Sequence, residues 1–401
     1  MEKTQCELFA GVGGFRLGME RASKEWKTVW FSQWEPGRKV QWAHDCYVHH
    51  FGDIDENTGI DIRKVDKKQI PDHNLLMAGF PCQDYSVARP RSGAKGLKGQ
   101  KGTLWWEIQE VLEEKRPSFV LMENVDRLLK SPSAQRGRDF GIMLACLAGL
   151  GYRAEWRVIN AADYGAGQRR RRVFIFAWRD STVYGRKMAA FSQEEILEKE
   201  GFFATVFPAL TAGKLRRTRI NWENLDKSME EFQFLFENTG YMENGEIVTG
   251  KTEPVTEPSV PLGDMLEKDV PESYFLTEES MEKWTYLKGA KRIERTSRTG
   301  YQYTFSEGAI AFPDSLDKPA RTMLTSEATV NRSSHVVRDP RSGRLRRLTP
   351  VEAERIQGFD DGWTDTGMTE RARYFCMGNA LVVPLITRMG KKIGRIFDEE
   401  P

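Results

Sequence analysis

The chain has 401 residues, of which 39% are hydrophobic and 29% charged, and its net charge is +2. This length predicts two or three domains, and the composition is too apolar for wholesale disorder. It contains no apolar run near the roughly 18 residues that a membrane helix needs and no signal-peptide pattern, so we expect a cytoplasmic protein without membrane contact. The five cysteines are scattered, without Cys-x-x-Cys or zinc spacing, so we expect neither disulfides nor a metal site.

Residues 1 to about 180 alternate short apolar runs with helical patterns. The alternation predicts an α/β fold with a mostly parallel, doubly wound sheet, in which ligands bind beyond the carboxyl ends of the strands. The expected strands are 7–10, 29–32, 75–78, 118–122 and 173–177, and the expected helices are 15–26, 104–114 and 140–150.

The middle of the chain lacks this rhythm and has a different charge pattern. Residues 222–272 carry 13 acidic and 3 basic residues, whereas 291–347 carry 12 basic and 6 acidic residues. A helix signature returns at Thr349, where Pro350 and Glu352 complete a capping box, and a last helix is expected to begin near Pro384. We therefore expect a large domain over 1–185, a second, smaller domain over 186–345, and a return to the large domain over 346–401.

A glycine turn follows the first expected strand at Gly11, Gly13 and Gly14. Glycines there let the backbone approach a ligand closely, although a tight turn without a ligand is the alternative interpretation. Trp34 and Glu35 end the next strand, where the carboxylate suits a ribose and the indole suits a purine. The alternative for this pair is a surface glutamate beside a core tryptophan.

Cys82 follows the strand 75–78 and comes directly after a proline that fixes the backbone. A cysteine held in this way is a candidate nucleophile, although most cysteines are buried structural residues. The loop that follows, 84–103, is long, glycine-rich and cationic. Loops of this kind are typical of lids and binding elements, and the positive charge favours an anionic polymer as substrate.

Glu123 ends the strand 118–122, and a carboxyl at that edge can share a proton with a heterocycle nitrogen. The run Gln168-Arg169-Arg170-Arg171-Arg172 precedes the strand 173–177. Strand alternation places Arg170 and Arg172 on one side. Taken by itself, this run is more simply interpreted as a basic surface segment in contact with solvent. Arg172 fits that interpretation least, because it is next to an apolar strand.

Together and in this order, these motifs resemble the DNA (cytosine-5)-methyltransferases. The resemblance covers about 1–180 and 346–401, where Arg347 to Phe359 and Gly378-Asn379-Ala380 match the late motifs of the family. It implies a fold of the S-adenosylmethionine-dependent methyltransferase type with 186–345 as the target-recognition domain. Glu7 stands where the family often has Asp, and Ala380 where it often has Ser.

The resemblance also implies roles for individual residues. The catalytic residues would be Cys82, Glu123, Arg170 and Arg172. S-adenosylmethionine, released as S-adenosylhomocysteine, would be bound by Phe9, Gly11, Gly13, Gly14, Trp34, Glu35, Asp61, Ile62, Phe80, Leu104, Asn379 and Ala380. Double-stranded DNA would be bound by Gln83, Ser86, Arg89, Arg91, Lys95, Arg321, Thr322 and Met323. Base-reading residues are expected between Lys291 and Arg347.

The implied mechanism is covalent. The thiolate of Cys82 would attack carbon 6 of a cytosine swung out of the duplex, so that carbon 5 becomes nucleophilic and accepts the methyl group. Glu123 would hold a proton on ring nitrogen 3, and Arg172, with Arg170, would bind the oxygen on carbon 2. We expect a monomer without a metal, with a restriction endonuclease as a possible partner.

Three other interpretations compete with this one. An RNA cytosine-5 methyltransferase would use the same scaffold, and a catalytically idle relative would bind DNA without turnover. A nicotinamide-dependent oxidoreductase would account for the glycine turn alone.

Overall fold

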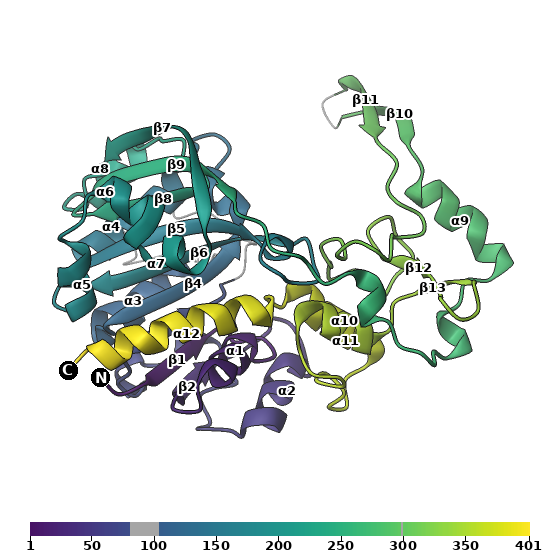
Figure 1. Cartoon of the computed structure of the whole chain (residues 1–401), viewed down its shortest axis with the longest axis horizontal. Coiled ribbons are helices and arrows are strands. Elements are labelled where there is room, and N and C mark those ends of the chain that lie inside the picture. Colours follow the sequence, from purple (N-terminus) through teal and green to yellow (C-terminus); the bar gives the residue numbers. More distant parts are fainter. Residues whose placement is uncertain (81–103, 298–299) are drawn as a thin grey trace. The chain divides into compact units, whose positions relative to one another are not determined.

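The computed structural model describes residues 1–80, 104–297 and 300–401. These residues form two compact units (Figure 1). The sheet unit comprises 1–164, 171–257 and 383–401, and the hairpin unit comprises 165–170 and 258–382. In the ranges described, no helix has both the length and the apolar character needed to cross a bilayer.

The sheet unit is built on one sheet that has nine strands in the described residues. β1 to β4 are mutually parallel, and β6, β5, β8, β9 and β7 follow in antiparallel pairs. Consequently β1, β2, β3, β4, β5 and β9 run in one direction and β6, β7 and β8 in the other. In spatial order the strands are β2 (Lys27–Ser32), β1 (Thr4–Leu8), β3 (Leu75–Ala78), β4 (Phe119–Val125), β6 (Arg171–Arg179), β5 (Tyr152–Asn160), β8 (Thr239–Glu243), β9 (Glu246–Pro254) and β7 (Ala209–Arg219).

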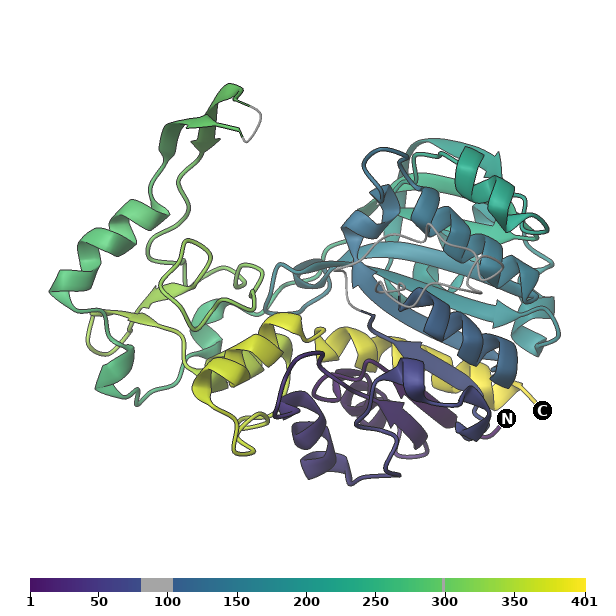
Figure 2. The same cartoon turned by 180° about the vertical axis from the view of Figure 1, so that it is seen from behind.

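Helices cover both faces of this sheet, which confirms the predicted α/β class (Figures 1 and 2). α1 (Gly14–Ala22) and α12 (Val383–Glu399) lie on one face, and α3 (Trp105–Lys115) and α4 (Arg138–Gly149) on the other. α1 and α12 pack closely, because a Cβ added to Gly18 would stand 2.5 Å from that of Ile386. The other helices of the unit are α2 (Trp42–Phe51), α5 (Val183–Met188), α6 (Gln193–Glu195), α7 (Phe202–Val206) and α8 (Leu225–Glu231). Single-turn helices are η1 (Ile62–Lys64), η2 (Lys67–Gln69), η5 (Asp126–Lys130), η6 (Ala161–Asp163) and η7 (Ile196–Glu200).

Long-range packing extends the sheet beyond the predicted strands. β5 was not predicted, and β7 to β9 come from the middle of the chain, yet they pair with this sheet. Trp156 of β5 lies opposite Gly240 of β8, and a Cβ on that glycine would stand 2.0 Å from the indole ring. The boundaries of the two compact units differ from those of the three predicted segments 1–185, 186–345 and 346–401. The role of 186–345 in target recognition stays a prediction.

The hairpin unit holds smaller elements around a buried ion-pair cluster. Arg346 is fully buried and pairs with Glu352 at 2.7 Å and with Asp339 at 3.1 Å. The capping box of Thr349 and Glu352 is formed as predicted. The elements are η8 (Leu262–Met265), η9 (Glu272–Tyr274), α9 (Glu278–Lys288), β10 (Lys291–Thr296), β11 (Gln302–Glu307), β12 (Val336–Arg338), β13 (Leu345–Arg347), α10 (Pro350–Gln357) and α11 (Glu370–Asn379).

Candidate active site

The strand order brings several predicted residues to one edge of the sheet. β2 and β3 flank β1, so the order of the strands reverses there, and the carboxyl ends of these parallel strands meet at the same edge. Such a reversal is where open α/β sheets bind ligands. Phe9 follows β1, Phe80 lies just beyond β3, and Glu123 lies near the end of β4.

Glu123 and Arg172 form an ion pair at this edge. The antiparallel register pairs Glu123 with Phe174 and Val125 with Arg172, so the two charged side chains are diagonal neighbours on one face. Glu123 Oε1 lies 2.9 Å from Arg172 Nε, and their side chains are 14% and 18% exposed. The pair is therefore shielded but still open to solvent and to a substrate.

The chain leading out of β3 is fixed beside this pair. Asn124 is buried, and its Nδ2 donates to the carbonyl of Phe80 at 3.0 Å. A Cβ on Gly79 would stand 4.0 Å from Glu123 Oε2, so no side chain separates the carboxyl from the backbone here. Cys82, Gln83, Ser86, Arg89, Arg91 and Lys95 lie outside the described residues, and their roles stay predictions.

The glycine turn adopts conformations that suit glycine. Gly11 and Gly13 have φ angles of 58° and 87°, and a Cβ on Gly13 would stand 2.4 Å from the Phe51 ring. Their N–H groups are already used, because Gly11 donates to Gln33 Oε1 at 2.7 Å and Gly13 to the Ala10 carbonyl at 3.0 Å. Apart from Gly11 itself and its two chain neighbours, no described atom lies within 4 Å of the position of a Cβ on Gly11. The turn therefore provides space for a ligand, whereas the N–H groups of Gly11 and Gly13 are not available as hydrogen-bond donors to it.

The predicted cofactor acid Glu35 is half-buried and held in place through its backbone. The side-chain amide of Gln41 accepts from the Glu35 N–H at 2.7 Å and donates to the Glu35 carbonyl at 3.1 Å. Burial raises the pKa of Glu35, against the opposing charge of Arg38 and a hydrogen bond from the Ala43 N–H. Trp34 beside it is also half-buried.

Asp61 and Ile62 begin a single helical turn. Asp61 accepts from the N–H of Arg63 at 3.1 Å and from its Nε at 3.0 Å. Burial alone would raise the pKa of Asp61, but the Arg63 contacts outweigh burial and the pKa is lowered. Ile62 is buried in the main core, and Leu104 packs against that core at the start of α3.

Arg170 differs from Arg172 in its surroundings. Its side chain is buried in the hairpin unit, where it donates to the carbonyls of Met323 at 3.0 Å and Gly378 at 2.9 Å. The buried Gln168 supports the same loop, since its Oε1 accepts from the Met323 N–H at 3.0 Å. These contacts give Arg170 a structural task within the hairpin unit, and its catalytic role stays a prediction.

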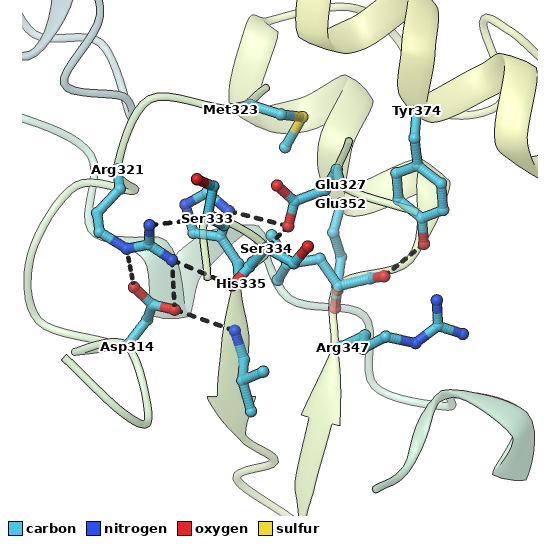
Figure 3. A network of polar contacts seen from close by, with 12 residues as sticks. Asp314, Arg321, Met323, Glu327, Ser333, Ser334, His335, Arg347, Glu352 and Tyr374 are labelled. Atoms are coloured by element: carbon cyan, nitrogen blue, oxygen red, sulfur yellow. Dashed lines mark hydrogen bonds and ion pairs between the residues drawn. The ribbon is translucent and has the colours of Figure 1, made fainter. Parts of the chain in front are cut away.

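The predicted DNA contacts Arg321, Thr322 and Met323 have partners or surroundings within the hairpin unit, and Figure 3 shows Arg321 and Met323. Arg321 Nε lies 2.5 Å from Asp314 Oδ1, and its Nη atoms donate to the carbonyls of Ser333 and Ser334 at 3.1 and 3.2 Å. Thr322 donates to the Arg169 carbonyl. Met323 is fully buried.

The last predicted cofactor residues lie at the end of α11, in the hairpin unit. Asn379 is the final helical residue and is exposed, and Ala380 is the C-cap. The preceding Gly378 allows the 324–325 backbone to come close, because a Cβ there would stand 2.3 Å from the Thr325 nitrogen. Binding of the cofactor by Asn379 and Ala380 stays a prediction.

Glu7 is a site residue that the sequence analysis noted without giving it a function. It is fully buried in β1, and its carboxyl accepts from the N–H groups of Phe15 and Arg16 in the first turn of α1 and from Tyr47 Oη at 3.3 Å. Burial raises its pKa to about 8, although Arg16 and these hydrogen bonds lower it. A lone carboxylate within an apolar strand was the signal available in the sequence.

The sheet order with its switch point at β1 and the shielded ion pair at the same edge are typical of α/β enzymes that bind a ligand at the carboxyl ends of their strands. The family model for C-5 cytosine-specific DNA methylases matches residues 4–395. The chain belongs to that family and acts as a DNA methyltransferase.

Curated relatives agree with this assignment, and a solved structure has a similar fold. The chain is 49% identical to the Type II methyltransferase M.Sau3AI of Staphylococcus aureus, over 97% of this chain and 95% of that protein. It is 26% identical to the Type II methyltransferase M.SsoII of Shigella sonnei, over 98% and 80% of the two chains. Its fold is similar to that of the Dnmt2 methyltransferase of S. pombe, with a TM-score of 0.58, 15% identity and coverage of 98% of each chain.

Proposed function

We propose that this DNA methyltransferase methylates carbon 5 of a flipped-out cytosine in a specific duplex sequence, through a covalent adduct of Cys82. The observation that carries the proposal is the shielded pair of Glu123 and Arg172, 2.9 Å apart. It lies beside Gly79, three residues before Cys82 in the sequence. A nucleophile can add to the cytosine ring, and a carboxyl and a guanidinium at the same place can stabilise the charge that this addition creates.

Each group has a defined task in this scheme. Attack of the Cys82 thiolate forms a carbon–sulfur bond at carbon 6 and pushes negative charge toward nitrogen 3 and the oxygen on carbon 2. Glu123 holds the proton at nitrogen 3, and Arg172 stabilises the charge on that oxygen. Once carbon 5 carries the methyl group, water takes the proton from carbon 5. The electron pair of that C–H bond re-forms the double bond between carbons 5 and 6, so that the carbon–sulfur bond breaks and the Cys82 thiolate leaves.

S-adenosylmethionine supplies the methyl group as an electrophilic sulfonium methyl when it is bound. The chain fits this group through the space beside Gly11 and through Glu35, whose carboxylate can accept from the ribose hydroxyls. Phe9 and Trp34 provide aromatic surface, and Asp61, Ile62, Phe80 and Leu104 complete the predicted wall.

A base in a duplex must leave the stack to reach such a site, at a cost of a few kcal/mol. We assign target recognition to residues between 186 and 345. Because the 49% identical relative is a Type II methyltransferase, we also propose a restriction endonuclease that cuts the same sequence.

The first test is bisulfite sequencing of DNA from a host that expresses the protein. Methylated cytosines in one recurring sequence are expected. Methylation of transfer RNA with unmodified DNA would overturn the DNA assignment in favour of an RNA enzyme.

The second test uses duplex DNA that carries 5-fluorocytosine at the methylated position. The fluorine cannot leave as a proton does, so the protein is expected to remain bonded to the DNA through denaturing electrophoresis. Cys82→Ala should bind the duplex without forming this adduct. An adduct formed equally by Cys82→Ala would contradict the role of the thiol.

A further inference from the structure

The hairpin of β10 and β11 is an exposed part of the hairpin unit. None of the twelve residues in these two strands, all within the described chain, is buried. In both overall views the hairpin projects beyond α9 (Figures 1 and 2). Its base is anchored, because Arg332 Nε lies 3.0 Å from Glu307 Oε1 and Arg332 Nη1 donates to the Gly289 carbonyl at 3.2 Å.

The two faces of the hairpin differ in chemistry. Residues directly opposite each other in an antiparallel pair share a face. One face, named here the polar face, consists of Arg292, Glu294, Thr296, Gln302, Thr304 and Ser306. The other consists of Lys291, Ile293, Arg295, Tyr303, Phe305 and Glu307.

The second face is partly covered by its own side chains. The Arg295 guanidinium lies 4.0 Å from the centre of the Phe305 ring, and Ile293 lies opposite Phe305. Lys291 Nζ lies 4.6 Å from the centre of the Tyr286 ring of α9. The polar face has no such cover, and its one internal side-chain bond joins Thr304 to Glu294 at 2.7 Å.

We propose that the polar face of this hairpin enters the major groove of the target DNA and reads its sequence, with Arg292 and Gln302 in contact with base edges. The proposal rests on the proposed function, because it takes duplex DNA as the substrate. A two-stranded ribbon has the cross-section that the major groove admits.

The composition of the polar face supports a base-reading role. Arginine forms paired hydrogen bonds with guanine, glutamine does so with adenine, and Ser, Thr and Glu supply the remaining donors and acceptors. From Arg292 to Thr296 the strand rises about 13 Å, which is comparable to four base-pair steps.

Charge and availability also favour DNA as the occupant. Residues 291–307 contain four Lys or Arg and two Glu, so the segment is attracted to phosphates. Arg292 is exposed and makes no side-chain hydrogen bond or ion pair with the described residues. Arg321, by contrast, is committed to Asp314 and to two carbonyls.

The test compares Arg292→Ala, Arg292→Lys and Gln302→Ala with the matched control Arg395→Ala. Arg395 is an exposed arginine on α12 of the sheet unit and lies outside the segment 186–345 that is assigned to target recognition. The probes are a duplex with the sequence methylated by the wild type and duplexes that each change one base pair of it. The readouts are kcat/KM for methyl transfer, its dependence on salt concentration, and the melting temperature.

Arg292→Ala is expected to lower kcat/KM on the target duplex about 5- to 150-fold and to relax discrimination at one base pair. Arg292→Lys should lose the same discrimination, because an ammonium cannot reproduce the paired hydrogen bonds of a guanidinium. Gln302→Ala should relax a different base pair. The salt slope and the melting temperature should match those of Arg395→Ala.

Two results would overturn the proposal. An equal loss on every duplex, with a salt slope smaller by about one, would make Arg292 a phosphate contact. If both Arg292→Ala and Gln302→Ala discriminated between the target duplex and the altered duplexes as well as the wild type does, the hairpin would not read bases. If the wild-type protein methylated no duplex, the proposed function itself would be refuted. The measurement of kcat/KM for the wild type, made first, distinguishes this outcome from a failure of the hairpin proposal.

Discussion

At the end of β4, Glu123 and Asn124 are held by partners within the protein, whereas on β10 Arg292 projects into solvent. Both regions are polar, but the polar groups of the first have partners within the protein and the guanidinium of the second is exposed to solvent. Chemistry at a single ring needs groups that are already oriented, because reorientation during the reaction costs rate. Reading a partner needs donors and acceptors that are not yet satisfied.

The difference predicts which substitutions damage the protein and which damage only its choice of substrate. Changes at held side chains should alter the rate of the reaction or the stability of the protein, and changes on the polar face should alter recognition of the target sequence without a loss of stability. Four variants test this division, beginning with the largest expected effect.

Glu123→Gln should lower the single-turnover rate of methyl transfer about 10²- to 10⁴-fold, because the variant cannot hold a proton at nitrogen 3. DNA binding should be retained, as measured by fluorescence anisotropy. Glu114→Gln on α3, an exposed site outside 186–345, is the matched control and should keep the wild-type rate. A Glu123→Gln rate within threefold of the wild type would contradict the assignment.

Arg321→Ala should destabilise the protein by about 3–5 kcal/mol, because it leaves Asp314 buried without its partner. Denaturant unfolding measures the loss. Arg292→Ala, in the same unit, should change the free energy of unfolding by no more than about 0.5 kcal/mol. Equal losses in the two variants would remove the distinction between held and exposed arginines.

Asn124→Asp removes the donor to the Phe80 carbonyl and keeps the shape of the side chain. We expect a loss of about 1–3 kcal/mol in the free energy of unfolding, since a buried carbonyl loses its partner. The chain that leads to Cys82 should also lose its position, so kcat should fall more than KM rises. An unchanged kcat would show that this contact does not position the nucleophile.

Glu7→Gln tests the buried carboxyl through pH. Because the pKa of Glu7 is raised to about 8 in the folded protein, the folded state binds more protons than the unfolded state at intermediate pH. Its contribution to stability is therefore present at low pH and lost as the pH rises, by up to about 1.4 kcal/mol per pH unit between about 5 and 8. Urea unfolding should show a smaller pH slope in Glu7→Gln than in the wild type, and identical slopes would refute the shift.

Sequence by itself determined the local elements and the order of the motifs. The strand 75–78 and the helix cap at Thr349 were predictable because strand alternation and capping depend on neighbouring residues. The same local patterns placed Glu123 at the end of one strand and Arg172 at the start of another, but only the antiparallel pairing of β4 with β6 brings these two residues to one edge of the sheet.

Tertiary structure alone decided which polar residues are held and which are exposed. The addition of β7, β8 and β9 to the sheet depends on contacts such as Trp156 with Gly240, far apart in the chain. Likewise, nothing next to Arg170 or Arg321 in the sequence indicates that carbonyls and a carboxylate distant along the chain bind their guanidinium groups. An arginine looks the same in a sequence whether it is buried or exposed, because its partners are chosen by the fold.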